Sequence, residues 1–268
     1  MIRQEAHRTA VTLSSVTFSY GRRTILKDIS FEVPAGSYCG IVGPNGSGKT
    51  TLAYLIAGIL TPQTGFVDIH GLRVGLVLSN PANQIVSLVV EEDIAFGPEN
   101  MGLMSPEIRA RIDYALSVIH SEHLRLSLTS SLSGGQLAKI AYAGQIALDV
   151  DVLVLDEGTV MLDPVSRESL LKTIRELNAD LDKTVIHISH RLDDLECATS
   201  VMVMGDGAMR MKAPDALSLA KDLEAIAKSG IEAGPHLIYK GFLQDLEIDE
   251  KDLEKATRLI AGRIQKHP

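Results

Sequence analysis

The chain is poor in cysteine and aromatic residues and has no tryptophan. Of its 268 residues, two are cysteines, Cys39 and Cys197, and 4% are aromatic. Neither cysteine has a second cysteine or a histidine at metal-ligand spacing, which argues against zinc sites and redox pairs. We therefore expect two reduced, buried thiols. The low aromatic content argues against the base-stacking platforms that bind single-stranded nucleic acid.

A positive charge balance and long apolar runs are also missing. The formal net charge is -8, and because nucleic acid and anionic lipid are bound through lysine and arginine, we expect no nucleic-acid partner. The longest mostly apolar stretch, Leu52 to Leu60, is far shorter than the roughly 20 residues that cross a bilayer. The N-terminal residues show no signal-peptide or anchor pattern. We expect a cytosolic protein that reaches the membrane only through a protein partner.

Four segments predict β-strands of two kinds. Apolar and polar residues alternate over Val11 to Phe18 and over Ile29 to Val33, which predicts an antiparallel pair. Apolar runs at Val152 to Leu155 and Thr184 to Ile188 are typical of parallel strands covered on both faces. The helical pattern from Val165 to Leu177 between these runs predicts a right-handed crossover. The fold class we expect is α/β.

Helical patterns predict two further parts of the chain. Two helices are expected to begin at Ser105 and Ser133, both plausible N-caps, within a helical insert. Charged amphipathic segments over 215–228 and 249–265 predict a small helical C-terminal domain. The expected domains are 1–210, with the helical insert at about 80–150, and 211–268.

A glycine-rich loop joins a predicted strand to a helix that we expect over about 49–59. It fits G-x-x-x-x-G-K-[ST], in which backbone N–H groups wrap phosphates and the helix N-terminus faces their negative charge. Lys49 is expected to pair with the β- and γ-phosphates of a nucleotide, and Thr50 to offer its hydroxyl to Mg2+. The residues expected to bind the nucleotide are Gly43, Pro44, Asn45, Gly46, Ser47, Gly48, Lys49, Thr50 and Thr51.

A second glycine-containing motif, L-S-G-G-Q at residues 132–136, stands at the start of a predicted helix. It again presents backbone N–H groups to an anion, although one chain cannot need two such loops for one triphosphate. With it the sequence resembles the ABC ATPase family, whose signature binds the γ-phosphate of the nucleotide held by the opposite subunit. The resemblance implies a head-to-tail dimer in which Ser133, Gly134, Gly135 and Gln136 act in trans.

Two acidic residues stand at the end of a predicted strand, after the signature motif in the chain. The strand Val152 to Leu155, followed by Asp156 and Glu157, resembles the Walker B motif of ABC ATPases. The resemblance implies that Asp156, with Thr50, holds Mg2+ and that Glu157 polarises the attacking water.

Three other residues match positions of the family. Asp163 stands in the D-loop, which touches the partner subunit, and His190 stands at the switch histidine, which contacts the γ-phosphate. Tyr20 matches the aromatic residue that stacks on adenine. The catalytic residues implied are Glu157, His190 and Lys49, with ATP and Mg2+ as cofactors.

Within that family the chain looks like the energy-coupling factor ATPases. The likeness rests on an N-P-x-N-Q segment at 80–84, an acidic stretch at 91–100 and the helical tail. It implies uptake of vitamins or transition-metal ions at the cytoplasmic face of the cell membrane. The implied partners are a second ATPase, identical or paralogous, a transmembrane scaffold and a small substrate-binding membrane protein.

The family's Q-loop glutamine is missing. After the predicted strand at 74–78 the chain has Ser79, which is too short to copy a glutamine. Gln84 either substitutes for it or belongs to the short helix that docks the scaffold. Three functions stay open: a transport ATPase, a slow, mainly nucleotide-binding partner of a paralogous ATPase, or a soluble ABC ATPase without a transport role.

Overall fold

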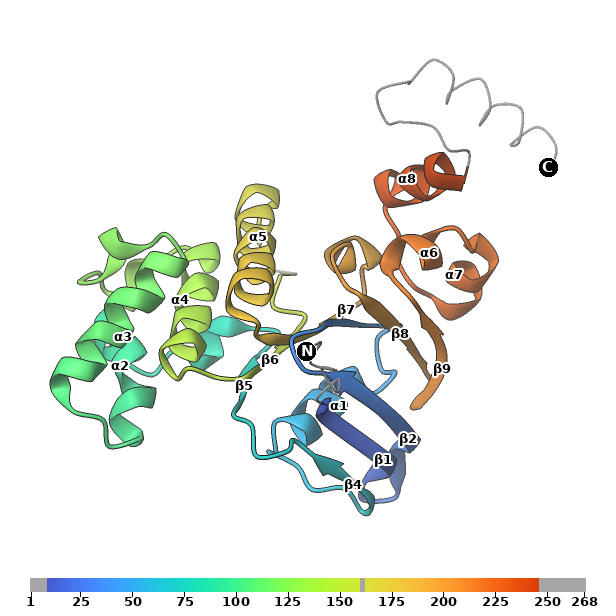
Figure 1. Cartoon of the computed structure of the whole chain (residues 1–268), viewed down its shortest axis with the longest axis horizontal. Helices are drawn as coiled ribbons and strands as arrows, with labels where there is room; N and C mark the ends of the chain where they lie inside the picture. The colour runs from blue at the N-terminus through green and yellow to red at the C-terminus, as the bar shows by residue number, and fades with distance from the viewer. Residues whose placement is uncertain (1–8, 160–161, 246–268) are drawn as a thin grey trace, which may run out of the picture.

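The computed structural model describes residues 9–159 and 162–245, which form two sheets and several groups of helices (Figure 1). One sheet has three strands in the order β2-β1-β4, and the other has six in the order β5-β6-β7-β3-β8-β9. The strands are β1 (Thr9–Tyr20), β2 (Arg23–Pro34), β3 (Tyr38–Val42), β4 (Thr64–Asp68), β5 (Val74–Val77), β6 (Val152–Asp156), β7 (Thr184–Ser189), β8 (Ser200–Gly205) and β9 (Ala208–Ala213).

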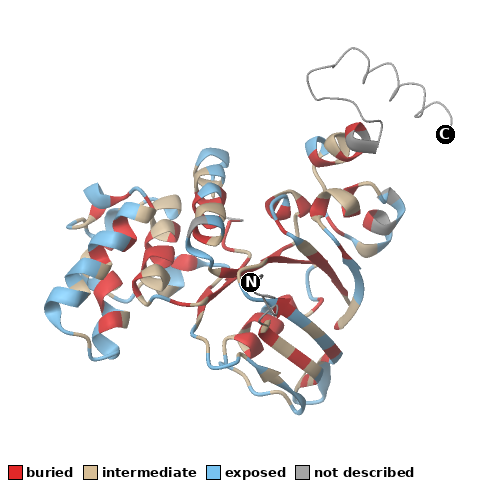
Figure 2. Cartoon of the chain, viewed as in Figure 1, coloured by how far each residue is buried: buried red, intermediate tan, exposed pale blue. Residues whose placement is uncertain are grey.

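The three-stranded sheet confirms the predicted antiparallel pair. β1 pairs with β2, and both continue beyond the alternating residues from which they were predicted. Their inward side chains, such as Val11 and Ile29, pack with helix α1 (Lys49–Ile56) and with one face of the larger sheet. Figure 2 shows these strands and α1 lining one buried layer.

The six-stranded sheet confirms the predicted parallel crossover. β6 and β7 pair in parallel and are buried along their whole length, and α5 (Pro164–Leu181) joins them. β3 lies between β7 and β8, with both of which it is parallel. The carboxyl ends of β3, β6 and β7 therefore meet at one edge of the sheet, where α/β folds place their ligands.

A helical subdomain lies beside β5, at one end of the sheet (Figure 1). Its main helices are α2 (Val90–Asn100), α3 (Ser105–Val118) and α4 (Gly134–Ala147). Ser133 is the N-cap of α4, as predicted, and forms a reciprocal capping box with Gln136. The N-cap prediction for Ser105 is wrong: Met104 takes that position without a side-chain bond, and Ser105 is already helical ahead of a proline that suits a first turn.

The C-terminal part covers the β8 and β9 end of the sheet (Figure 1). The predicted segment at 215–228 contains two short helices, α6 (Ala216–Ala220) and α7 (Leu223–Ser229), and α8 (Pro235–Asp245) follows. The predicted helix at 249–265 lies outside the described residues. The domain boundary stays a prediction, and β9 crosses it.

Four short 3-10 helices lie in the connections between these elements: η1 (Pro81–Gln84), η2 (Glu122–Leu124), η3 (Thr129–Ser131) and η4 (Leu192–Leu195).

The prediction that both thiols are buried is half wrong. Cys39 lies in β3, and burial raises its pKa to about 11, whereas Cys197 follows η4 on the surface. The turn after η4 faces solvent, which the local sequence pattern did not indicate.

Candidate functional site

The glycine-rich loop follows β3 and ends at the first turn of α1. Gly46 and Gly48 have φ values of 80 and 99 degrees, in the left-handed region that favours glycine. A Cβ on Gly48 would lie 2.7 Å from a methyl carbon of Leu26, and one on Gly43 would lie 2.3 Å from the carbonyl oxygen of Met204. The loop therefore packs so closely on β8 at Gly43 and on β2 at Gly48 that only glycine fits at these two positions.

A cavity of about 320 Å³ opens above this loop. Its lining brings most of the predicted phosphate-binding residues together with Glu157 from the end of β6. The lining residues are Arg23, Ile25, Asn45, Gly46, Gly48, Lys49, Thr50, Thr51 and Glu157. Arg23 was missed by the sequence reasoning. It pairs with Tyr20 across the β1–β2 turn, so its nearness in the sequence to the predicted adenine-stacking residue is a signal that could have identified it.

Lys49 is held in place by the loop it follows. Its Nζ donates hydrogen bonds to the carbonyl oxygens of Gly43 at 2.8 Å and Pro44 at 3.1 Å. The same atom lies 3.3 Å from Oε1 of Glu157, and the Lys49 side chain is only 5% exposed. The charge of Lys49 is therefore fixed at the cavity by three oxygen atoms.

Thr50 and Asp156 join the loop to the end of β6. The Thr50 hydroxyl donates a hydrogen bond of 3.2 Å to Oδ1 of Asp156, whose other oxygen is buried without a hydrogen-bond partner among the described residues. Burial raises the pKa of Asp156 and the charge of Glu157 adds to the shift, while Thr50 and Lys49 oppose it. A hydroxyl beside a buried carboxylate oxygen that lacks a donor is an oxygen-ligand set that fits Mg2+.

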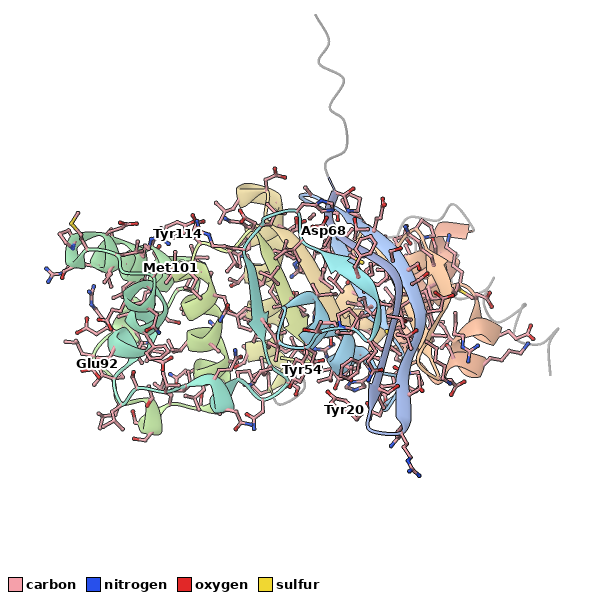
Figure 3. All side chains as sticks on the ribbon, turned by 90° about the horizontal axis from the view of Figure 1, so that it is seen from below. Tyr20, Tyr54, Asp68, Glu92, Met101 and Tyr114 are labelled. Atoms are coloured by element: carbon pink, nitrogen blue, oxygen red, sulfur yellow. The ribbon has the colours of Figure 1, made fainter. Side chains whose placement is uncertain are left out.

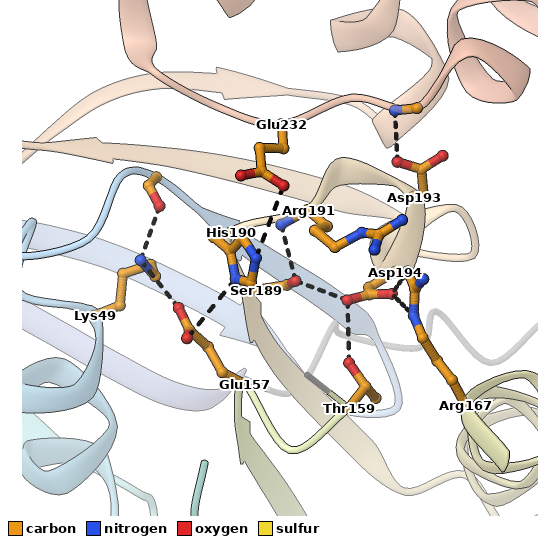
Figure 4. Close-up of polar contacts among 12 residues, drawn as sticks. Lys49, Glu157, Thr159, Arg167, Ser189, His190, Arg191, Asp193, Asp194 and Glu232 are labelled. Carbon is orange, nitrogen blue, oxygen red and sulfur yellow. Dashed lines mark hydrogen bonds and ion pairs between the residues drawn. The ribbon is translucent and has the colours of Figure 1, made fainter. Parts of the chain in front are cut away.

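Glu157, which lines the cavity, also contacts His190 (Figure 4). Glu157 has a φ of 53 degrees, and its backbone N–H donates to the carbonyl oxygen of Ile188 at 3.0 Å. Its Oε2 lies 3.7 Å from Nδ1 of His190. The structure thus brings together Lys49, Glu157 and His190, the three residues expected to be catalytic.

Comparison with known proteins decides which family this geometry belongs to. Residues 26–160 match the family described as ABC transporter. The energy-coupling factor transporter ATP-binding protein EcfA1 of Symbiobacterium thermophilum is 41% identical, with 75% of this chain and 78% of that protein covered. The chain belongs to the ABC transporter family. As a member of this family it is an ATPase that binds ATP.

Two further relatives agree with this assignment. The EcfA1 protein of Streptococcus pyogenes serotype M12 is 38% identical, with 74% of this chain and 76% of that protein covered. The solved structure of cbiO1 from Clostridium perfringens, described as part of the ABC transporter complex cbiONQ, has a TM-score of 0.74 and 30% identity. That match covers 89% of this chain and 99% of the solved chain. No helix among the described residues is long and apolar enough to span a membrane.

In this ABC ATPase the residues expected to form the signature and the D-loop lie side by side. Asp163 is the N-cap of α5 and accepts hydrogen bonds of 3.1 Å from the N–H groups of Val165 and Ser166. A Cβ on Gly135 would lie 2.7 Å from Oγ of Ser166, whereas one on Gly134 meets no atom within 4 Å. The described residues that line the phosphate cavity include none from 133–136.

Tyr20 stands at the turn between β1 and β2, far from the helical subdomain that carries Glu92 (Figure 3). Tyr20 is 51% exposed, and its ring packs in a T-shaped arrangement against Phe18, with ring centroids 5.0 Å apart. An exposed aromatic ring whose position is fixed by contact with a second ring suits stacking on a flat ring system.

Gln84 is tied to the end of β5. Its Oε1 accepts a hydrogen bond of 2.8 Å from the N–H of Leu78, and its Nε2 donates one of 2.8 Å to the carbonyl oxygen of Leu76. Ser79, the residue at the Q-loop position, is exposed. The Gln84 amide therefore completes backbone hydrogen bonding, a role that sequence reasoning did not anticipate.

A buried carboxylate, also missed from the sequence, connects the segment after β6, helix α5 and the end of β7 (Figure 4). Asp194 accepts hydrogen bonds from the hydroxyls of Thr159 at 3.1 Å and Ser189 at 2.9 Å, and from Nε of Arg167 at 2.7 Å. Burial acts to raise the pKa of Asp194, yet the positive charge of Arg167, the hydrogen bonds and, once it is protonated in acid, the charge of His187 hold it below its usual value. The sequence pattern offered no signal that separates this acid from its neighbour Asp193.

Proposed function

We propose that the chain is the ATP-hydrolysing subunit of an energy-coupling factor type importer of vitamins or transition-metal ions. The observation that carries the proposal is that Glu157, at the phosphate cavity, contacts both Lys49 and His190 beside the Thr50–Asp156 pair. The names of the relatives support the transport role, since two of them are energy-coupling factor ATP-binding proteins.

In this proposal each residue has a separate task. Lys49 binds the β- and γ-phosphates of ATP, Glu157 polarises the attacking water, and His190 contacts the γ-phosphate. Thr50 and Asp156 would hold Mg2+, which supplies positive charge to the phosphates when it is bound. Tyr20 stacks on adenine, where Arg23 adds a positive charge nearby.

We propose that two chains, identical or paralogous, form the working unit at the cytoplasmic face of the cell membrane. Ser133, Gly134, Gly135 and Gln136 then complete the site of the opposite subunit. Their placement at the open N-terminus of α4, away from the phosphate cavity of the same chain, supports this arrangement.

The membrane partners are a transmembrane scaffold and a small substrate-binding membrane protein, and the scaffold docks on the helical subdomain. A cleft of about 450 Å³ there is lined by the acids Glu91, Glu92 and Glu99. Large apolar side chains stand exposed around it, which is typical of an interaction surface. They are Val86, Leu88, Phe96, Met104, Leu126 and Leu128.

The experiment is to purify the tagged chain from detergent-solubilised membranes of its own cells and identify the co-purifying proteins by mass spectrometry. A second ATPase, a scaffold and a small membrane protein support the proposal. A large paired permease indicates another type of ABC transporter. Soluble partners alone overturn the transport role in favour of a soluble ABC ATPase.

The second candidate, a slow nucleotide-binding partner of a paralogous ATPase, is favoured by one observation. Ser79 is short, and the Gln84 amide is already bonded to the backbone of β5. Under that candidate Ser79→Gln raises the turnover of ATP, whereas unchanged turnover counts against it.

A further inference from the structure

A segment of the C-terminal part runs directly beside the switch histidine. The backbone N–H of Glu232 donates to the carbonyl oxygen of His190 at 3.2 Å, and the N–H of Leu192 donates to the carbonyl oxygen of Glu232 at 2.8 Å. Arg191 and Glu232 thus form a parallel bridge between chain segments about forty residues apart. The backbone around His190 is shaped by the tail as well as by β7.

The side chain of Glu232 also approaches the imidazole (Figure 4). Its Oε2 lies 3.9 Å from Nε2 of His190, while Oε2 of Glu157 lies 3.7 Å from Nδ1. Nδ1 is buried and has no hydrogen-bond partner among the described residues. The ring is therefore placed between two carboxylates, one from the end of β6 and one from the C-terminal part.

The Glu232 segment is anchored on both sides. The N–H of Gly234 donates to Oδ2 of Asp193 at 2.7 Å, and a Cβ at Gly234 would lie 2.4 Å from the other oxygen of that carboxylate. Ile231 and Leu237, which flank the segment, are buried in the main core. Glu232 itself is 72% exposed, so its position comes from its neighbours and its backbone, and its carboxylate is not packed in the core.

We propose that Glu232 is a positioning residue for His190 and that the C-terminal part thereby belongs to the hydrolytic machinery. A neutral imidazole carries its proton on one nitrogen, and the partner of each nitrogen decides which. The Glu232 carboxylate stabilises a proton on Nε2 and thereby opposes Glu157, whose carboxylate stabilises one on Nδ1, so that the two acids together set the tautomer of His190. The proposal rests on the role given to His190 under the proposed function.

The test compares Glu232→Ala with Glu224→Ala, which removes another exposed glutamate of the C-terminal part. Glu232→Ala keeps the backbone pairing with His190 and Leu192, so folding is preserved. Because the carboxylate is exposed, we expect a modest loss of about two- to fivefold in kcat with an unchanged KM for ATP. The 15N chemical shifts of His190 should move toward the Nδ1–H tautomer, a change that a merely structural role does not produce. Glu224→Ala should leave both unchanged.

A double-mutant cycle separates this proposal from the role of His190. In a His190→Ala background, Glu232→Ala should cause no further loss, because the two residues act as one unit. The same two- to fivefold loss in that background, or an unchanged tautomer in Glu232→Ala, overturns the positioning role. If His190→Ala leaves hydrolysis unchanged while Glu232→Ala still shifts the tautomer, the role of His190 has failed and the Glu232 contact stands.

Discussion

The Nζ atom of Lys49 lies 3.3 Å from Oε1 of Glu157. The first residue of α1 and the residue after β6 thus share an ion pair at the mouth of the phosphate cavity, although they are far apart in the sequence (Figure 4). The cation attracts phosphate and the carboxylate attracts a proton of water, so replacing each residue should have a different effect.

Replacing Glu157 by glutamine should abolish hydrolysis while nucleotide binding persists. The amide keeps the shape of the side chain but cannot act as a base, and loss of a general base costs about 10²- to 10⁴-fold in rate. Lys49→Ala should instead weaken the binding of ATP. Both variants are measured by a phosphate-release assay and by titration with a fluorescent ATP analogue. Normal hydrolysis in Glu157→Gln refutes the role given to this residue.

Two glycines of α4 provide a matched test of the signature. A Cβ on Gly134 or on Gly144 meets no atom of the described residues within 4 Å, and alanine in a helix is more favourable than glycine. Both Gly134→Ala and Gly144→Ala should therefore keep the melting temperature of the chain. Only Gly134→Ala should lower ATP hydrolysis, by roughly tenfold, which corresponds to about 1.4 kcal/mol, because in the proposed dimer its methyl group would face the nucleotide of the partner. Equal activities of the two variants would argue against a signature that acts in trans.

Gln84 should matter for stability through the two hydrogen bonds at the end of β5. Removing its amide in Gln84→Ala leaves the N–H of Leu78 and the carbonyl of Leu76 without their partner, which costs about 1 to 3 kcal/mol in free energy of unfolding. Asn83→Ala, at an exposed neighbouring position of the same 3-10 helix, is the control and should cost less than about 0.5 kcal/mol. Urea denaturation measures both. A Gln84→Ala chain as stable as Asn83→Ala would show that these bonds contribute nothing.

The parts that the sequence predicted are those with local causes. Alternation over Val11 to Phe18 marked a strand with one buried face, and Ser133 followed three residues later by Gln136 marked a capped helix. The family assignment came from motifs whose order and spacing are read directly along the chain. Because these motifs belong to one family with one fold, they also predicted the fold class, which the structure and the comparisons confirm.

The predictions that failed, and the residues that were missed, depend on contacts between distant segments. Helix α2 was not predicted as a separate helix, because it contains Pro98 near its end and a proline usually ends or kinks a helix. The burial of Asp194 depends on Arg167 and Thr159, and the place of Glu232 beside His190 depends on how the tail folds back. A single sequence shows none of these pairings, because they are properties of the packed chain.

A buried histidine should make the chain sensitive to acid. His187 lies in β7 with no solvent exposure, and its Nδ1 is 2.8 Å from the hydroxyl of Tyr38. Burial lowers the pKa of His187 to about 4, and the charge of Asp194 opposes the shift. The unfolded chain takes up this proton near pH 6.5 and the folded chain only near pH 4, so acid favours the unfolded state. Between these values the free energy of unfolding should fall by about 3 kcal/mol through this residue.

Urea denaturation at pH 7.0, 5.5 and 4.5 measures that loss. His187→Asn removes the titrating group, so its stability should fall less over this range, whatever its stability at pH 7. His123→Asn, which changes an exposed histidine, should keep the full loss. Asp194 does not interfere, because its lowered pKa means that its contribution disappears only below its usual value near 3.9. Parallel loss in His187→Asn and the unsubstituted chain would assign the acid sensitivity to other groups.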